Sequence, residues 1–193
     1  MDLIALLGLP LDANSSFLLG CEHGPAAIRE SLLSASGNDA NEASVNVTSL
    51  IEDMGNVAVD NERGSFLDAD AITGAVDEQL AAGRQIISLG GDHSVTYPIL
   101  RAFRAHHAEL TVVHIDAHPD MYDDLDGNPL SHASPFARAL EDGCVTTLVQ
   151  LGIRTATQHQ VEQAARWNVT MLSPRQLDRF DRPHKQLNVL QQP

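Results

Sequence analysis

Residues 86–120 have the sequence IISLGGDHSVTYPILRAFRAHHAELTVVHIDAHPD, in which two short apolar runs flank a longer amphipathic segment. The runs at 86–89 and 110–115 are β-prone and predict strands, whereas 94–107 has the residue spacing of a helix. Short apolar strands that alternate with helices are typical of a parallel sheet with helices on its faces. This stretch therefore predicts an α/β fold.

The same alternation extends to both sides of this stretch. Apolar runs at 3–11 and 147–153 predict further strands. Apolar residues at helical spacing predict further helices at 26–33, 68–85, 133–141 and 158–166. Because the chain has no internal repeat or linker, we expect residues 1–193 to form one domain, a three-layer α/β/α parallel sheet, with 179–193 as a polar tail.

The composition is that of a folded, acidic protein. Of the 193 residues, 43% are hydrophobic and 20% are charged, which argues against a disordered chain. Asp and Glu number 26 against 12 Lys and Arg, and a net charge of −14 would repel nucleic acid and anionic membranes, so neither is expected as a partner. The N-terminal apolar run begins with an acid, where a signal peptide needs cations. The two cysteines are far apart and form no C-x-x-C motif, as expected in a reducing compartment, so we expect a cytoplasmic location.

Polar clusters follow the two central strands directly. They are GGDHS at 90–94 and DAHPD at 116–120. Ligands collect at the carboxyl ends of parallel strands, and Asp116, His118 and Asp120 alternate, so they project to one side of an extended chain. Carboxylates and imidazoles without thiolates suit Mn²⁺ or another hard to borderline ion, which would also neutralise the charge in the cleft. Together with the histidine of GGDHS, these residues predict a metal site of two His and two Asp.

Each of these residues also has a purely structural interpretation. His93 could cap a helix or lie in the core, and an Asp-x-His-x-Asp segment could be a solvated loop. Asp92 could orient an imidazole through a hydrogen bond or simply form a turn. His132, just before a predicted helix, could shuttle a proton over the cleft or belong only to the start of the helix. His114 lies inside a predicted strand and is expected in the core or facing the backbone.

In their order and spacing, three segments of the chain resemble the ureohydrolases, the two-manganese enzymes that include arginase, agmatinase and formimidoylglutamase. These segments are GGDHS at 90–94, DAHPD at 116–120 and SHASPFAR at 131–138. Residues 24–29 resemble the early helix of the family, and 148–154 resemble the strand that follows its third motif. Within the family, residues 122–136 are closest to the agmatinase-like branch that also contains the plant-type arginases.

The resemblance implies a binuclear manganese centre. His93 and Asp120 would bind one Mn²⁺, His118 would bind the other, and Asp116 would bridge the two ions. A hydroxide held between two such ions, about 3.5–4 Å apart, is a strong nucleophile at neutral pH. The fold implied is the arginase-like sheet.

The resemblance also implies a substrate and further site residues. The substrate would be a small guanidino compound, agmatine or arginine, which is hydrolysed to urea and an amine. Asp92 would support the ligands, and His132 would deliver a proton to the departing amine. Asn128 and Ser134 are the residues that we expect to contact the substrate. Because oligomers are typical of the family, a homo-oligomer is expected.

The family completes its metal pair with an Asp-x-Asp motif and Asp-Pro on a later strand, and with a Glu beyond it. After Arg154 the nearest match is Asp178 with Asp181, which are three apart, flanked by Arg, and preceded by no apolar strand. The chain is therefore expected to end before the last metal-ligand motif and the last strands of the sheet.

Two functions remain open at this point. The first is a manganese-dependent ureohydrolase. The alternative is a catalytically impaired, truncated homologue that serves only as a non-enzymatic remnant or as a partner of an intact ureohydrolase. A single-zinc deacetylase of the same fold is disfavoured by GGDH at 90–93 and by Asp120.

Overall fold

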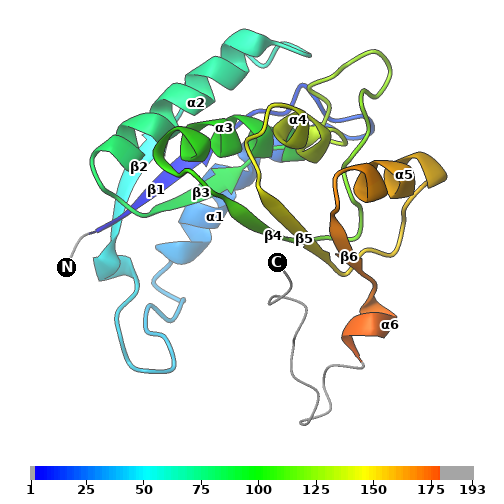
Figure 1. Ribbon diagram of the computed structural model, residues 1–193. Helices are drawn as coiled ribbons and strands as arrows, with labels where there is room; N and C mark the ends of the chain where they lie inside the picture. Colours follow the sequence, from blue (N-terminus) through cyan, green and yellow to red (C-terminus); the bar gives the residue numbers. More distant parts are fainter. Residues whose placement is uncertain (1–2, 179–193) are drawn as a thin grey trace.

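The computed structural model describes residues 3–178, and its strands form two parallel sheets of three strands each (Figure 1). The first sheet has the order β2-β1-β3 and the second has the order β4-β5-β6. All strand pairs within the two sheets are parallel. The strands are β1 (Ile4–Leu9), β2 (Ile51–Asn56), β3 (Ile86–Gly90), β4 (Thr111–Ile115), β5 (Thr147–Leu151) and β6 (Thr170–Leu172).

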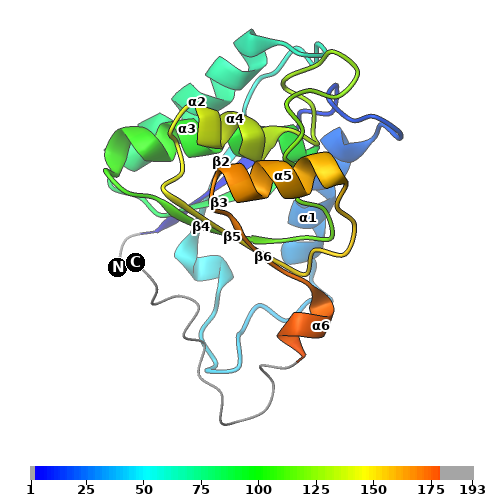
Figure 2. The same ribbon diagram turned by 45° about the vertical axis from the view of Figure 1, so that its right-hand side comes forward.

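Helices connect successive strands and lie on both sides of them. Figure 1 shows α2, α3 and α4 on one side and α1 on the other, and in Figure 2 α5 lies on the side of α3 and α4. The predicted α/β architecture is therefore confirmed. The helices are α1 (Gly24–Leu32), α2 (Phe66–Ala81), α3 (Thr96–His106), α4 (Pro135–Glu141), α5 (Gln158–Arg166) and α6 (Pro174–Leu177).

Capping residues or a proline begin three of these helices. Ser65 precedes α2, and its Oγ accepts a hydrogen bond from the Asp68 N–H at 3.3 Å. Thr157 begins α5 with a reciprocal capping box, in which the Thr157 N–H donates to Gln160 Oε1 at 3.1 Å. Pro135 occupies the first turn of α4, where its missing N–H leaves no helical hydrogen bond unmade.

The core consists of two apolar clusters that share α2 and α3. The first cluster packs the start of these helices against α4, β5 and α5, around Phe136 and Met121. The second packs β1 against Ile72 and Val76 of α2 and Ala102 of α3. Since the same two helices enter both clusters, they join the two sheets into one body.

The differences from the predicted elements have local causes. The helix predicted at 68–85 ends at Ala81, because Gly83 takes a left-handed φ of 75° that terminates it. The helix predicted at 94–107 begins only at Thr96, after a 3-10 turn over His93–Val95. The predicted tail at 179–193, which contains Asp181, lies outside the described residues.

No helix among residues 3–178 is both long and apolar enough to cross a lipid bilayer.

Candidate metal centre

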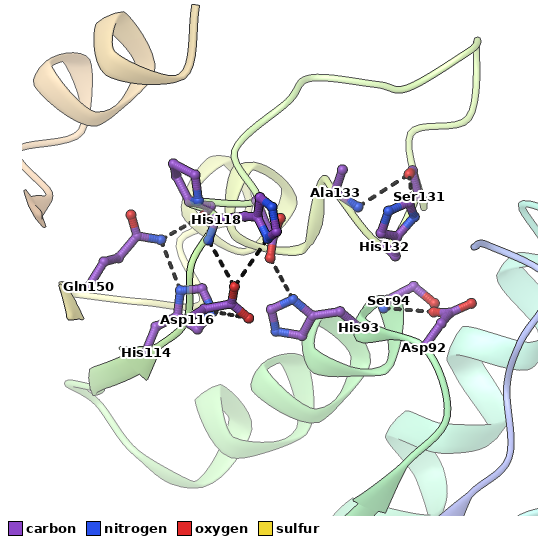
Figure 3. A network of polar contacts seen from close by, with 12 residues as sticks. Asp92, His93, Ser94, His114, Asp116, His118, Ser131, His132, Ala133 and Gln150 are labelled. Atoms are coloured by element: carbon purple, nitrogen blue, oxygen red, sulfur yellow. Dashed lines mark hydrogen bonds and ion pairs between the residues drawn. The ribbon is translucent and has the colours of Figure 1, made fainter. Parts of the chain in front are cut away.

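Four side chains at the ends of β3 and β4 converge in one cluster. His93, His114, Asp116 and Asp120 each offer a ligand atom, and these atoms all lie within 4.8 Å of one another. Figure 3 shows His93 and Asp116 approaching from different elements, the turn after β3 and the segment after β4. The His93 Nδ1 atom lies 2.7 Å from Asp120 Oδ2. We refer to these four residues as the His/Asp cluster.

The backbone restricts the residue type at two positions beside the cluster, Gly91 and Asp120. Gly91 donates its N–H to the Leu9 carbonyl at 2.8 Å, and a Cβ at Gly91 would collide with the Leu11 carbonyl oxygen. Only glycine therefore lets the chain turn here and present His93 to the cluster. Asp120 takes a left-handed φ of 50°, a conformation that Asp tolerates better than most residues. This turn aims its carboxylate at His93.

Asp116 is held as a carboxylate by its surroundings. Partial burial alone would raise its pKa, but the hydrogen bond from the His118 backbone N–H, 2.8 Å from Oδ1, and the nearby imidazoles of His114 and His93 lower the pKa below its usual value. An ionised carboxylate between two imidazoles is suited to bind a divalent cation.

His114 belongs to the cluster, although the sequence analysis placed it in the core. Its side chain is buried in β4, as expected, but Nε2 points towards Asp116 Oδ2 at 3.6 Å and has no hydrogen-bond partner among the described residues. Burial and the neighbouring His93 lower the pKa of His114, which favours the neutral imidazole that a metal requires. In the sequence, its alternation with Asp116 was the only indication, and a core histidine of a strand has the same pattern.

His118 lies beside the cluster and not within it. Its side chain is 59% exposed, and its Nδ1 atom is 3.4 Å from Asp116 Oδ1. Of the four predicted ligands, the structure therefore brings together His93, Asp116 and Asp120.

Asp92 and His132 are both tied to the loop that contains Asn14. The buried Asp92 carboxylate accepts the N–H of Asn14 at 2.9 Å and the N–H of Ser94 at 2.8 Å; burial raises its pKa although these bonds oppose the shift. His132 Nδ1 lies 2.9 Å from the Asn14 carbonyl oxygen, which can only accept, so Nδ1 carries a proton. Figure 3 shows both residues on the side of His93 away from Asp116.

The cluster opens into a cavity of about 380 Å³. Three residues of the His/Asp cluster, His93, Asp116 and Asp120, line it together with His118 and His132. The other lining residues are uncharged: Tyr122, Leu125, Ala133, Thr155, Thr157 and Gln160. Asn128 and Ser134, the predicted substrate contacts, do not line this cavity. Both are buried, and Asn128 Nδ2 donates to Asn14 Oδ1 at 2.8 Å, so it supports the loop behind His132.

Comparisons with known proteins agree on one family. The family model described as "Arginase family" matches residues 2–191. Arginase 1, mitochondrial, of Arabidopsis thaliana is 37% identical over 187 residues, and N(1)-aminopropylagmatine ureohydrolase of Thermus thermophilus is 32% identical over 186 residues. The solved structure of an arginase from Medicago truncatula matches with a TM-score of 0.82 and 35% identity.

These matches cover nearly all of this chain but only part of the relatives. Each alignment covers 93% of this chain, yet only 54% of the Arabidopsis protein and 60% of the Thermus protein. The structural match covers 94% of this chain and 59% of the Medicago chain. Because the Arabidopsis relative is named as mitochondrial, the cytoplasmic location stays a prediction. The family model and the fold together establish that the chain belongs to the arginase family of ureohydrolases.

Proposed function

We propose that this chain carries the metal-binding part of a ureohydrolase, which hydrolyses a small guanidino compound, agmatine or arginine, to urea and an amine with the help of Mn²⁺. The observation that carries the proposal is the His/Asp cluster at the floor of a cavity, where two imidazoles and two carboxylates lie within 4.8 Å of one another. Family membership supports the reaction type.

The chemistry of the cluster fits a divalent ion. His93, His114, Asp116 and Asp120 offer only nitrogen and oxygen donors, and His114 Nε2 is a buried nitrogen without a hydrogen-bond partner among residues 3–178. Such a donor set suits Mn²⁺ better than a soft, thiolate-bound metal. His118 borders the cluster, with Nδ1 3.4 Å from Asp116 Oδ1, and would be the ligand of a second ion. When bound, the metal would supply Lewis-acid activation of water at neutral pH.

The other residues of the cavity bind substrate and move protons. Hydrolysis of a guanidino group adds water to its central carbon and releases an amine that must gain a proton. His132 holds its Nδ1 proton against the Asn14 carbonyl, so its Nε2 lone pair is left to accept a proton from the attacking water and pass it to the departing amine. The uncharged wall formed by Tyr122, Thr155 and Gln160 would hold the aliphatic part of the substrate.

The first test is the manganese content of the purified chain after Mn²⁺ loading and desalting, followed by urea release from agmatine and arginine. We expect bound Mn²⁺ and urea from one of these substrates. His93→Ala should abolish Mn²⁺ retention, whereas His106→Ala should not. The latter is a matched control, because His106 also lies 2.7 Å from an aspartate, Asp77, but on the surface and away from the cavity.

A second candidate function follows from the coverage of the relatives. The chain spans little more than half the length of the relatives that it matches, so it could act only as a non-catalytic partner of an intact ureohydrolase. A folded sample that retains no Mn²⁺ and releases no urea would favour this second function and contradict the first.

A further inference from the structure

A buried amide on the neighbouring strand holds the imidazole of His114. His114 in β4 lies opposite Gln150 in β5 in the register of the two parallel strands. Gln150 Nε2 lies 3.2 Å from His114 Nδ1 and 2.7 Å from the carbonyl oxygen of Pro119. Both side chains are buried, and Figure 3 shows His114 between Gln150 and Asp116. The amide of Gln150 therefore reaches the His/Asp cluster through the ring of His114.

These contacts fix which nitrogen of His114 carries a proton. The carbonyl oxygen of Pro119 can only accept a hydrogen bond, so the Gln150 atom beside it is the donating amide nitrogen. The second hydrogen of that amide is available to His114 Nδ1, and Nδ1 must therefore accept. Burial and the neighbouring His93 lower the pKa of His114, which favours its neutral form. In a neutral imidazole whose Nδ1 accepts, Nε2 carries the proton.

The protonated Nε2 of His114 faces the carboxylate of Asp116. Nε2 lies 3.6 Å from Asp116 Oδ2, and the other oxygen, Oδ1, accepts the backbone N–H of His118 at 2.8 Å. Donors therefore approach the carboxylate from two directions. A histidine that binds a metal through one nitrogen donates its other N–H to an acceptor. At His114 the other nitrogen meets the donor of Gln150 instead, which is the opposite arrangement.

We propose that His114 is a positioning residue, which directs its Nε2 proton at Asp116 and does not itself bind the metal ion. Distance alone places His114 in the His/Asp cluster, whereas Gln150 turns a proton and not a lone pair of His114 towards it. The ligand atoms of the cluster are then those of His93, Asp116 and Asp120. These three residues line the cavity, and His114 does not. The inference rests on the proposed function, because it assigns a role at the same site.

The first test needs neither metal nor substrate. Long-range proton–nitrogen correlation spectra of the chain with isotope-labelled histidine, recorded in EDTA, distinguish the two neutral tautomers from the imidazolium. We expect His114, identified by the signals that His114→Gln loses, to be the neutral Nε2–H tautomer. Gln150→Leu should shift the Nδ1 signal of His114, whereas Gln79→Leu should not, since the buried Gln79 instead accepts from Arg84 at 3.1 Å. An Nδ1–H tautomer or an imidazolium at His114 would overturn the proposal.

Titration with Mn²⁺ separates a positioning residue from a ligand, in variants that circular dichroism shows to be folded. His114→Leu should weaken Mn²⁺ binding by about 10–100-fold, the usual effect of losing an outer hydrogen-bond partner of a ligand. His114→Gln should restore most of the affinity, because the glutamine amide supplies an N–H in place of Nε2. Complete loss of Mn²⁺ in both variants, as in His93→Ala, or unchanged affinity in His114→Leu would overturn the proposal. If the wild type itself binds no Mn²⁺, the proposed function fails, while the spectra in EDTA still decide which proton His114 carries.

Discussion

Asp53 shows how one side chain couples the stability of the fold to pH. Its carboxylate in β2 accepts the Gly55 N–H at 2.9 Å and lies 2.9 Å from Arg29 Nε of α1. The bond from Gly55, and then Arg29, lower the pKa of Asp53 although partial burial opposes them. A carboxyl group with a lowered pKa in the folded state stabilises the fold above its usual titration range, and this contribution is lost as the pH falls through the lowered pKa.

We therefore expect Asp53→Asn to flatten the acid dependence of stability. The variant should lose less of its free energy of unfolding than the wild type between about pH 5 and pH 2, because it has no proton to take up. At neutral pH it should be less stable by under about 1 kcal/mol, since the Asp53 side of the ion pair is 43% exposed. Urea unfolding at several pH values measures both the acid dependence and the free energy of unfolding at neutral pH. Arg29→Gln should keep most of the dependence, because the Gly55 bond remains; if it matches Asp53→Asn, the ion pair dominates instead.

At the scale of residues, the sequence predicts the composition of the site better than its geometry. Asp116 and Asp120 could be found because they alternate after an apolar strand. His114 could not be told from a core histidine, because its burial in β4 and its orientation towards Asp116 depend on pairing with β5. The bond from Asn128 to Asn14 crosses 114 positions, so no local pattern in the sequence indicates it. The assigned roles of His118, His132, Asn128 and Ser134 stay predictions.

At the scale of elements, Asp92 links the turn before α3 to the loop around Asn14. Asp92→Ala should lower the free energy of unfolding by about 1–3 kcal/mol, because two backbone N–H groups lose their acceptor. Hydrogen exchange of the Asn14 amide should accelerate as well. Glu30→Ala, on an exposed position of α1, is the control and should change neither. If Asp92→Ala instead loses Mn²⁺ retention at unchanged stability, Asp92 acts on the His/Asp cluster and not on the fold.

Element boundaries follow from the sequence where the local signal is strong. Helix α5 matches its prediction at 158–166, since Thr157 and Gln160 form a capping box. Strand β2 has no such signal. Its sequence IEDMGN has two acids and a glycine, and it becomes a strand because it pairs with β1, at a distance that sequence periodicity does not report. Strand β6, at three residues, is too short for a periodic pattern.

At the scale of the whole molecule, α2 and α3 should make unfolding cooperative. Ile72 is buried in the cluster on β1, whereas Trp167, the single tryptophan, packs against the other cluster. Ile72→Ala should cost about 2–5 kcal/mol, the usual range for such a truncation. Because the two clusters share helices, the Trp167 fluorescence transition in urea should shift together with the circular dichroism transition. A fluorescence transition that stays in place would show that the two sheets unfold separately.

The order of the strands in the first sheet also sets when the fold can form during synthesis. β1 is made first but lies between β2 and β3, so its second side stays unpaired until the ribosome has made Ile86–Gly90. At 5–20 residues per second, roughly 4 to 15 s separate the completion of β1 from the start of β3. The second sheet is made in its spatial order, and each new strand can add at once to the one before it. The nascent chain is therefore most exposed to chaperones and to misfolding early, while the leucine-rich β1 waits for its partner.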